Sequence, residues 1–183
     1  DEKASKVPPG SSGLVFIPHM AGRIAPYDPR IRGVWFGLRL DHKIEHLYRS
    51  MLEGNAYEYD YFLRVMKEYG FNPLEIRAVG GGGRSGVWNK IKADVLGIPY
   101  VRLNREDGAV LGLTAIVGFA VGVFKDLATP IRKWVRPVER IHPRKEFHQL
   151  YEGYSELYLR LITDQSGCFS QLDELTRRNL PEG

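Results

Sequence analysis

The sequence lacks several features that mark whole classes of protein. It contains one cysteine, Cys168, so no disulfide can form within the chain, and we expect a reducing compartment, the cytoplasm. Its polar start does not resemble a signal peptide. The 26 basic and 22 acidic residues are interspersed and give a net charge of only +4, so we expect no nucleic acid partner.

Long hydrophobic runs are also scarce. Only residues 108–124 form an uncharged run, and its length is at the short end of what spans a membrane. Acidic residues flank this run, and its four glycines suit close packing in lipid and in a protein interior alike. We therefore predict a fully buried helix here and expect no membrane partner.

What the chain does contain is the pattern of one α/β domain. With 183 residues it is long enough to bury a single core. Short apolar runs between turn-forming residues predict strands at 14–18, 33–38, 76–79 and 99–103. Residues 1–12 read as a linker, 13–164 as the folded domain and 165–183 as a loose tail. Strands that alternate with helices in this way are typical of α/β folds.

Two amphipathic helices are predicted from apolar residues at helical spacing. The first is long, with Asp41 as its cap and Gly70 at its end, and the second follows Pro143. Between them, residues 129–138 contain two prolines and read as irregular or extended. Gly54 lies inside the long helix, where glycine costs roughly 1 kcal/mol relative to alanine, so we expect another backbone to come close there.

A dense glycine stretch at 80–83 separates a short apolar segment from a helical pattern. Ser85 stands where a helix N-cap belongs, and Gly97 suits a left-handed C-terminal position. A strand, a glycine turn and a helix N-terminus in this order present backbone N–H groups to an anion. We therefore predict that a nucleotide phosphate or ribose lies against Gly81 and Gly82. The alternative is a tight turn without a ligand, because the stretch matches neither the lysine-bearing P-loop nor the dinucleotide fingerprint.

A second pattern points to metal chemistry. His42, Glu45 and His46 fit the H-x-x-E-H arrangement of inverted zinc peptidases. A zinc enzyme also needs a third ligand, and no acidic residue marks one. We expect no metal site in this chain.

Three groups of residues, taken in order, resemble FGGY-type carbohydrate kinases such as xylulokinase and glycerol kinase. The first group comprises Phe16-Ile17-Pro18, Gly22, Pro26-Tyr27-Asp28-Pro29, Arg32-Gly33-Val34, Phe36-Gly37-Leu38, His46, Leu52-Glu53-Gly54 and Ala56. The second comprises Gly80-Gly81-Gly82, Ser85, Trp88, Ala93-Asp94 and Leu96-Gly97, and the third comprises Asp107-Gly108-Ala109 and Leu111-Gly112. The resemblance covers about residues 16–124.

The resemblance implies a ribonuclease-H-like domain of the actin-like ATPase superfamily, with a mixed sheet flanked by helices. The chain is similar to the C-terminal, adenosine-binding domain of these kinases, so Gly81, Gly82, Gly83 and Ser85 would contact ATP or ADP, which Mg²⁺ accompanies. The parent enzyme would transfer the γ-phosphoryl group of ATP to a hydroxyl of a ketose or polyol, with a xylulose-like sugar favoured. Its implied partners are that sugar or polyol, the N-terminal kinase domain of the same protein, and a second copy in a homodimer.

The family places its catalytic aspartate just before this domain. The resemblance therefore implies no catalytic residue in this chain, and we expect the isolated chain to phosphorylate nothing. The loop at 22–26 faces the sugar side in relatives. The alternative is a non-catalytic module that binds nucleotide or pairs with another subunit, in which tyrosines such as Tyr57, Tyr59, Tyr61 and Tyr69 would face the partner rather than complete a core.

Overall fold

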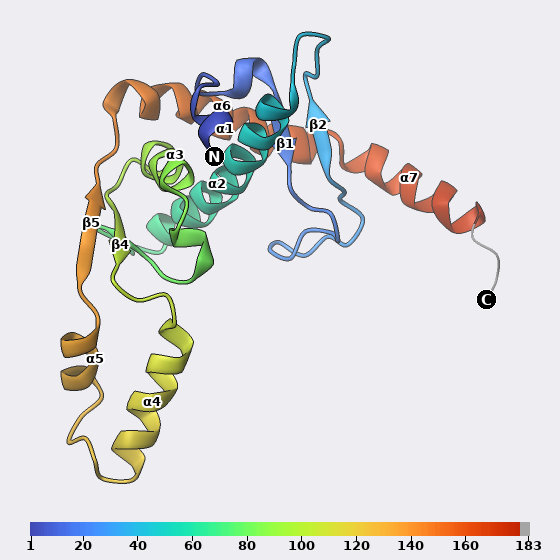
Figure 1. Cartoon of the computed structure of the whole chain (residues 1–183). Coiled ribbons are helices and arrows are strands. Elements are labelled where there is room, and N and C mark those ends of the chain that lie inside the picture. The colour runs from blue at the N-terminus through green and yellow to red at the C-terminus, as the bar shows by residue number, and fades with distance from the viewer. Residues whose placement is uncertain (180–183) are drawn as a thin grey trace.

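The computed structural model describes residues 1–179, and the end of the predicted tail, 180–183, lies outside the described residues. The long helix α2 (Ile44–Glu68) is central to the fold (Figure 1). Strands β1 (Val15–Ile17) and β2 (Val34–Phe36) form an antiparallel pair, and β1 packs on α2. Helices α3 (Gly86–Leu96) and α6 (Lys145–Asp164) pack against α2 and against each other.

The second sheet is mixed and carries the order β3-β4-β5. Strands β3 (Ile76–Ala78) and β4 (Tyr100–Leu103) run parallel, and α3 connects them. Strand β5 (Pro137–Ile141) pairs antiparallel with β4. The α/β class, the mixed sheet and its flanking helices are thus as predicted.

Close packing between α2 and β1 explains the glycine within the helix. A Cβ atom added at Gly54 would collide with the backbone carbonyl of Phe16. Glycine is therefore the residue that lets the strand backbone approach the helix axis, as the sequence predicted. Aromatic side chains extend this core, because the buried Tyr57 ring lies 6.1 Å from Tyr151 and 5.7 Å from Tyr158.

One buried carboxylate joins three distant segments. Glu53 of α2 is 1% exposed, and its Oε1 accepts hydrogen bonds from Gly10 N at 3.0 Å, Arg49 Nε at 2.8 Å and Tyr151 Oη at 2.7 Å. Its Oε2 accepts from Ser11 Oγ at 2.7 Å. The charge of Glu53 is thus balanced by Arg49 and satisfied by donors from the N-terminal segment and α6.

The structure corrects the linker expected at residues 1–12. This segment holds a short helix, α1 (Glu2–Ser5), and buries Ala4, Val7 and Ser11. Arg49 donates from Nη1 to the carbonyl of Ala4 at 3.1 Å. A polar segment can pack in this way because its backbone and hydroxyl groups satisfy buried charges of α2, a role that composition does not reveal.

The tail expected from residue 165 is also ordered where the structure describes it. It forms α7 (Ser166–Asn179), and Phe169 at its start is 5% exposed and joins the main core. The predicted helix cap at Asp41 is wrong as well. Asp41 pairs with Arg39, and α2 begins after Lys43, whose N–H donates to His46 Nδ1 at 3.1 Å.

The uncharged run forms most of a projecting arm. It folds as α4 (Gly108–Ala120), and α5 (Ala128–Trp134) packs beside it, away from the rest of the chain (Figure 1). Only Leu111, Ala115 and Gly118 of α4 are buried, whereas Val110 and Leu113 remain more than 60% exposed. The predicted fully buried helix is therefore wrong for the described residues. The stretch at 129–138, predicted to be irregular or extended, is instead helical up to the end of α5 at Trp134 and is extended where β5 begins. Among the described residues, no helix is both long and apolar enough to cross a membrane.

Candidate functional site

The glycine stretch forms a tight turn at the carboxyl ends of β3 and β4. Gly81–Gly83 make one 3₁₀ turn directly after β3, and α3 begins at Gly86. Ser85 Oγ accepts a hydrogen bond from Trp88 N at 3.1 Å, which confirms the predicted N-cap. Ligands of α/β proteins bind at this edge of a parallel sheet, where strands end and helices begin.

The four glycines serve different purposes. Gly80 has a φ of 73°, a conformation that favours glycine. A Cβ at Gly83 would lie 3.3 Å from Ala78 Cβ, and one at Gly82 would lie 3.4 Å from Trp88 Cζ3. A Cβ at Gly81 would meet nothing within 4 Å. Packing within the described chain therefore does not require glycine at position 81. Close approach of a ligand to this backbone would require it.

Two backbone donors of the turn have acceptors within residues 1–179, and two do not. Gly83 N donates to Gly80 O and Arg84 N donates to Gly81 O, each at 3.1 Å. Within residues 1–179, no acceptor lies in hydrogen-bond reach of the N–H groups of Gly81 and Gly82. These two exposed donors, next to the N-terminus of α3, suit an anionic or hydroxyl-rich ligand.

Two side chains of α3 hold the inner side of the turn. Lys92 donates from Nζ to Gly82 O at 3.1 Å and to Tyr100 Oη at 3.1 Å, and its ammonium lies 3.6 Å from the centre of the Trp88 ring. Asn89 donates from Nδ2 to Gly83 O at 2.7 Å. Burial lowers the pKa of Lys92 to about 8. The sequence analysis missed both residues, although they interrupt the apolar face of the helix.

Arginines line the outer side of the turn. A cavity of about 170 Å³ is bounded by the turn, Arg84, Arg102, Arg105 and Glu106. Arg84 Nε donates to Glu106 at 2.7 Å and holds the pKa of that carboxyl below its usual range. Nucleotide-sized ligands occupy pockets of roughly 300–1,000 Å³, so this chain supplies only one wall of such a site.

The third group of motif residues lies beside the turn. The Arg84 and Glu106 pair links the turn to the segment that leads into α4. A Cβ at Gly108 would lie 3.7 Å from Val79 Cβ, so the start of α4 approaches the chain just before the glycines. The structure therefore brings Gly108 close to the segment that holds Gly81, Gly82, Gly83 and Ser85, although Gly108 is distant from these residues in the sequence.

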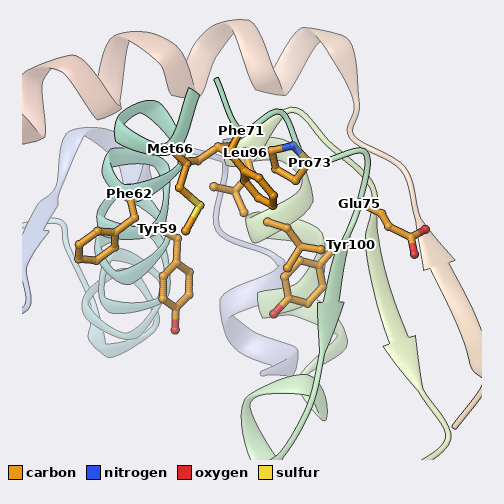
Figure 2. Close-up of a pocket in the computed structure, with 10 residues that line it drawn as sticks. Tyr59, Phe62, Met66, Phe71, Pro73, Glu75, Leu96 and Tyr100 are labelled. Atoms are coloured by element: carbon orange, nitrogen blue, oxygen red, sulfur yellow. The ribbon is translucent and has the colours of Figure 1, made fainter. Parts of the chain in front are cut away.

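Two larger cavities, each about 510 Å³, differ from the glycine turn in character. One lies between α2 and the start of β3, and its lining is mostly apolar, with Tyr59 and Tyr100 facing it from α2 and β4 (Figure 2). Few polar groups converge in this cavity, so it offers little for chemistry.

The other large cavity adjoins the loop at 22–26. Arg23 there binds Glu58 through two hydrogen bonds of 3.2 and 3.3 Å, and Tyr158 Oη donates to the same carboxylate at 2.8 Å. Burial lowers the pKa of the neighbouring His19. These buried charges satisfy one another and fix the shape of the loop.

The histidines of the H-x-x-E-H pattern serve the start of α2. His42 Nδ1 accepts from Arg39 N at 3.0 Å, and His46 Nδ1 accepts from Lys43 N at 3.1 Å. In the described part of the chain, no three His, Cys, Asp or Glu side chains gather as a metal site. One ring nitrogen of each histidine is thus engaged with the backbone at the start of α2.

Comparisons with known proteins find relatives that match most of this chain. The gluconokinase of Bacillus subtilis is 37% identical over 176 residues, which is 95% of this chain and 34% of that protein. The xylulose kinase of Staphylococcus epidermidis is 30% identical over 150 residues, which is 81% of this chain and 30% of that protein. The crystal structure of xylulose kinase from Rhodospirillum rubrum superposes with a TM-score of 0.81 at 30% identity, covering 92% of this chain and 34% of that one.

These relatives are kinases with an alcohol group as acceptor, and their actin-like ATPase fold confirms the predicted superfamily. This chain spans about a third of their length. Residues 1–121 match the family described as "FGGY family of carbohydrate kinases, C-terminal domain". The chain therefore belongs to the FGGY family of carbohydrate kinases and corresponds to its C-terminal domain.

Proposed function

We propose that this chain forms the adenosine-binding half of an ATP-dependent carbohydrate kinase. The observation that carries the proposal is the glycine turn at the carboxyl ends of β3 and β4, where the N–H groups of Gly81 and Gly82 lack acceptors within residues 1–179. An adenine nucleotide offers phosphate and ribose oxygens that such donors bind. The open space at Gly81 lets the ligand approach the backbone.

The proposed site residues have distinct roles. Gly81 and Gly82 are exposed and would touch the nucleotide directly. Gly83 is buried, so it would act through the shape of the turn. Ser85 is half-buried and already caps α3, and its hydroxyl would face the ribose or base from the cap position.

Catalysis would require groups from outside this chain. Phosphoryl transfer needs a carboxylate base and a cation to neutralise the β- and γ-phosphates. Mg²⁺ is held in kinase sites mainly by the phosphates and by one or two carboxylates, and the donors around this turn are N–H groups and arginines that suit the nucleotide rather than the metal. Mg²⁺ would therefore arrive with the nucleotide, and the isolated chain would not phosphorylate a sugar.

For the acceptor, we favour a ketose or polyol of xylulose-like chemistry, because xylulose kinases recur among the sequence and structure relatives. Gluconate is the second candidate, since the gluconokinase of Bacillus subtilis is 37% identical to this chain. The test is a steady-state assay of the full-length kinase with xylulose, gluconate and glycerol, in which the true substrate gives the highest kcat/KM. The loop at 22–26 would face this substrate.

The proposed partner is the N-terminal kinase domain of the same protein, since the relatives are about three times as long as this chain. A homodimer and a location in the cytoplasm are also part of the proposal. The alternative remains a module that binds nucleotide or pairs with another subunit without catalysis. A complex of this chain with its N-terminal half that binds ADP but never turns over a sugar would favour that alternative.

Calorimetric titration with Mg-ADP tests the nucleotide site. Gly81→Val is the most informative variant, because its side chain would enter open space and leave the fold intact. We expect saturable binding by the native chain and at least tenfold weaker binding by this variant. Gly153→Val is the matched control, since Gly153 is also exposed with no neighbour within 4 Å, but lies on α6. Equal binding by Gly81→Val and the native chain would contradict the proposal, and the full-length kinase repeats the test if the half-site needs its partner.

A further inference from the structure

We propose that Lys92 is a positioning residue of the nucleotide site, which together with Asn89 holds the glycine turn in the shape that presents its N–H groups to the ligand. The inference deepens, and rests on, the proposed function of the turn. It concerns two side chains of α3 that lie one turn apart and reach consecutive peptide units of the turn.

The hydrogen-bond geometry shows how the two side chains shape the turn. Lys92 binds the carbonyl of Gly82 and Asn89 binds the carbonyl of Gly83, so both carbonyls face α3. Within a planar trans peptide the N–H points opposite to the C=O. The N–H groups that follow these carbonyls therefore turn away from α3 and close the 3₁₀ turn, which leaves the earlier donors of Gly81 and Gly82 free for a ligand.

The surroundings of Lys92 indicate that its charge is not there for stability. Lys92 is 2% exposed, and its ammonium contacts a carbonyl, a hydroxyl and the Trp88 ring, while within residues 1–179 it forms no ion pair with a carboxylate. A buried charge without a counter-charge destabilises a fold, and a methionine or leucine would fill the same volume among aromatic rings. The centre of the Tyr100 ring lies 4.9 Å from the ammonium, and the centre of the Tyr59 ring lies 6.0 Å from it.

Asn89, like Lys92, is a buried polar side chain that lies next to the glycine turn without full compensation by partners. It is fully buried, and its Oδ1 has no hydrogen-bond partner while its Nδ2 binds the turn. Buried polar atoms without partners are rare, and local departures from good packing concentrate at functional sites. Lys92 and Asn89 are thus two incompletely compensated polar side chains on one face of α3, and both bind the glycine turn. This favours a role in fixing the shape of the turn rather than in packing the helix.

The charge of Lys92 adds an electrostatic contribution. Its pKa of about 8 leaves the ammonium mostly protonated at pH 7. A positive charge bound to the back of the turn raises the attraction of the turn for phosphate. The other titratable groups that face this ammonium are Tyr100 of β4, whose pKa burial raises to about 12, and Tyr59 of α2. Lys92, with its pKa of about 8, changes its charge between about pH 7 and pH 9.

The test compares Lys92→Met with Lys90→Met, which alters an exposed lysine of the same helix. Three properties are measured: Mg-ADP affinity by calorimetry, the midpoint of urea unfolding, and amide hydrogen exchange of residues 81–84 by NMR. We expect Lys92→Met to be at least as stable as the native chain, to bind Mg-ADP about tenfold more weakly, and to exchange the amides of Gly83 and Arg84 faster. Lys90→Met should match the native chain in all three.

The outcomes separate this inference from the proposed function. Unchanged ADP affinity and unchanged exchange in Lys92→Met would overturn the role of Lys92. Faster exchange in that variant, together with no ADP binding by the native full-length kinase, would uphold the effect of Lys92 on the shape of the turn and reject the nucleotide site.

If Lys92→Met does not fold, a pH titration of the native chain decides the question. The amide resonances of Gly82 and Gly83 should then shift together with a midpoint near pH 8, as the ammonium bound to this turn loses its proton. Resonances that do not move between pH 6 and 10 would overturn the inference.

Discussion

Replacing Glu53 by alanine should remove much of the stability of this domain. The carboxylate is 1% exposed and accepts four hydrogen bonds, of which those from Arg49 and Tyr151 are 2.8 and 2.7 Å long. Without Glu53, the guanidinium of Arg49, itself 5% exposed, would remain buried with no counter-charge. Breaking a buried pair in this way costs about 3–5 kcal/mol, and small domains are stable by only about 5–15 kcal/mol.

Urea unfolding followed by circular dichroism measures this loss. The expected result for Glu53→Ala is a fall in the free energy of unfolding of about 3–5 kcal/mol, seen as a lower midpoint. Glu106→Ala is the control, because it removes a carboxylate whose partner Arg84 is exposed, and such pairs contribute about 0–1 kcal/mol. If Glu53→Ala lost less than about 1 kcal/mol, or no more than the control, the network would not hold the N-terminal segment to α2 and α6 as we argue.

Three further predictions concern the same fold. Gly54→Ala should lower the urea midpoint, because the new methyl group would strike the carbonyl of Phe16, even though alanine favours helices by about 1 kcal/mol relative to glycine. Gly153→Ala is the control: it has open space around it and should raise the midpoint. Ser85→Ala should lower the free energy of unfolding by about 1 kcal/mol through the lost cap on α3, and a loss below a few tenths would show that the cap is redundant. The native chain should become more stable between about pH 8 and pH 10, because the pKa of Lys92 is about 8 when folded and about 10.4 when unfolded, so the unfolded chain binds more protons in that window; a rise of the same size in Lys92→Met would assign it to another group.

Local signals in the sequence were sufficient for much of the fold. Ser85 and Gly97 mark the two ends of α3 because a side-chain cap and a left-handed residue act on their own neighbours, and both are found as predicted. Gly54 predicted the approach of another backbone, because glycine within a helix needs a compensating contact. Features of this kind depend on a few residues close in sequence.

Features that depend on distant partners were predicted less well. Asp41 was expected to cap α2, but its pairing with Arg39 left that role to Lys43. The prolines at 130 and 137 suggested irregular or extended chain. Pro137 does begin an extended edge strand, but Pro130 lies in the first turn of α5, a position that tolerates proline. Composition likewise cannot say what covers an apolar helix, which is why the exposure of α4 was missed.

The candidate site shows the same division. The glycine turn was visible because a run of glycines between a strand and a helix acts through the backbone of a few consecutive residues. Lys92 and Asn89 were not, because their effect depends on side chains that fold back onto the turn from within α3. A polar residue four positions after Trp88, inside an apolar stripe, was the signal that would have identified Lys92.

The contact between Gly54 and Phe16 also has a mechanical consequence. α2 has 25 residues and is therefore about 37 Å long, and its closest backbone contact with β1 lies near the middle of this length. Shifting the helix by one residue along its screw axis, a rise combined with a rotation, would bring the side chain of Glu53 or Asn55 against the same carbonyl, so the helix and the strand pair are locked in register. They would move as one rigid body, so any hinge that moves this unit must lie outside it.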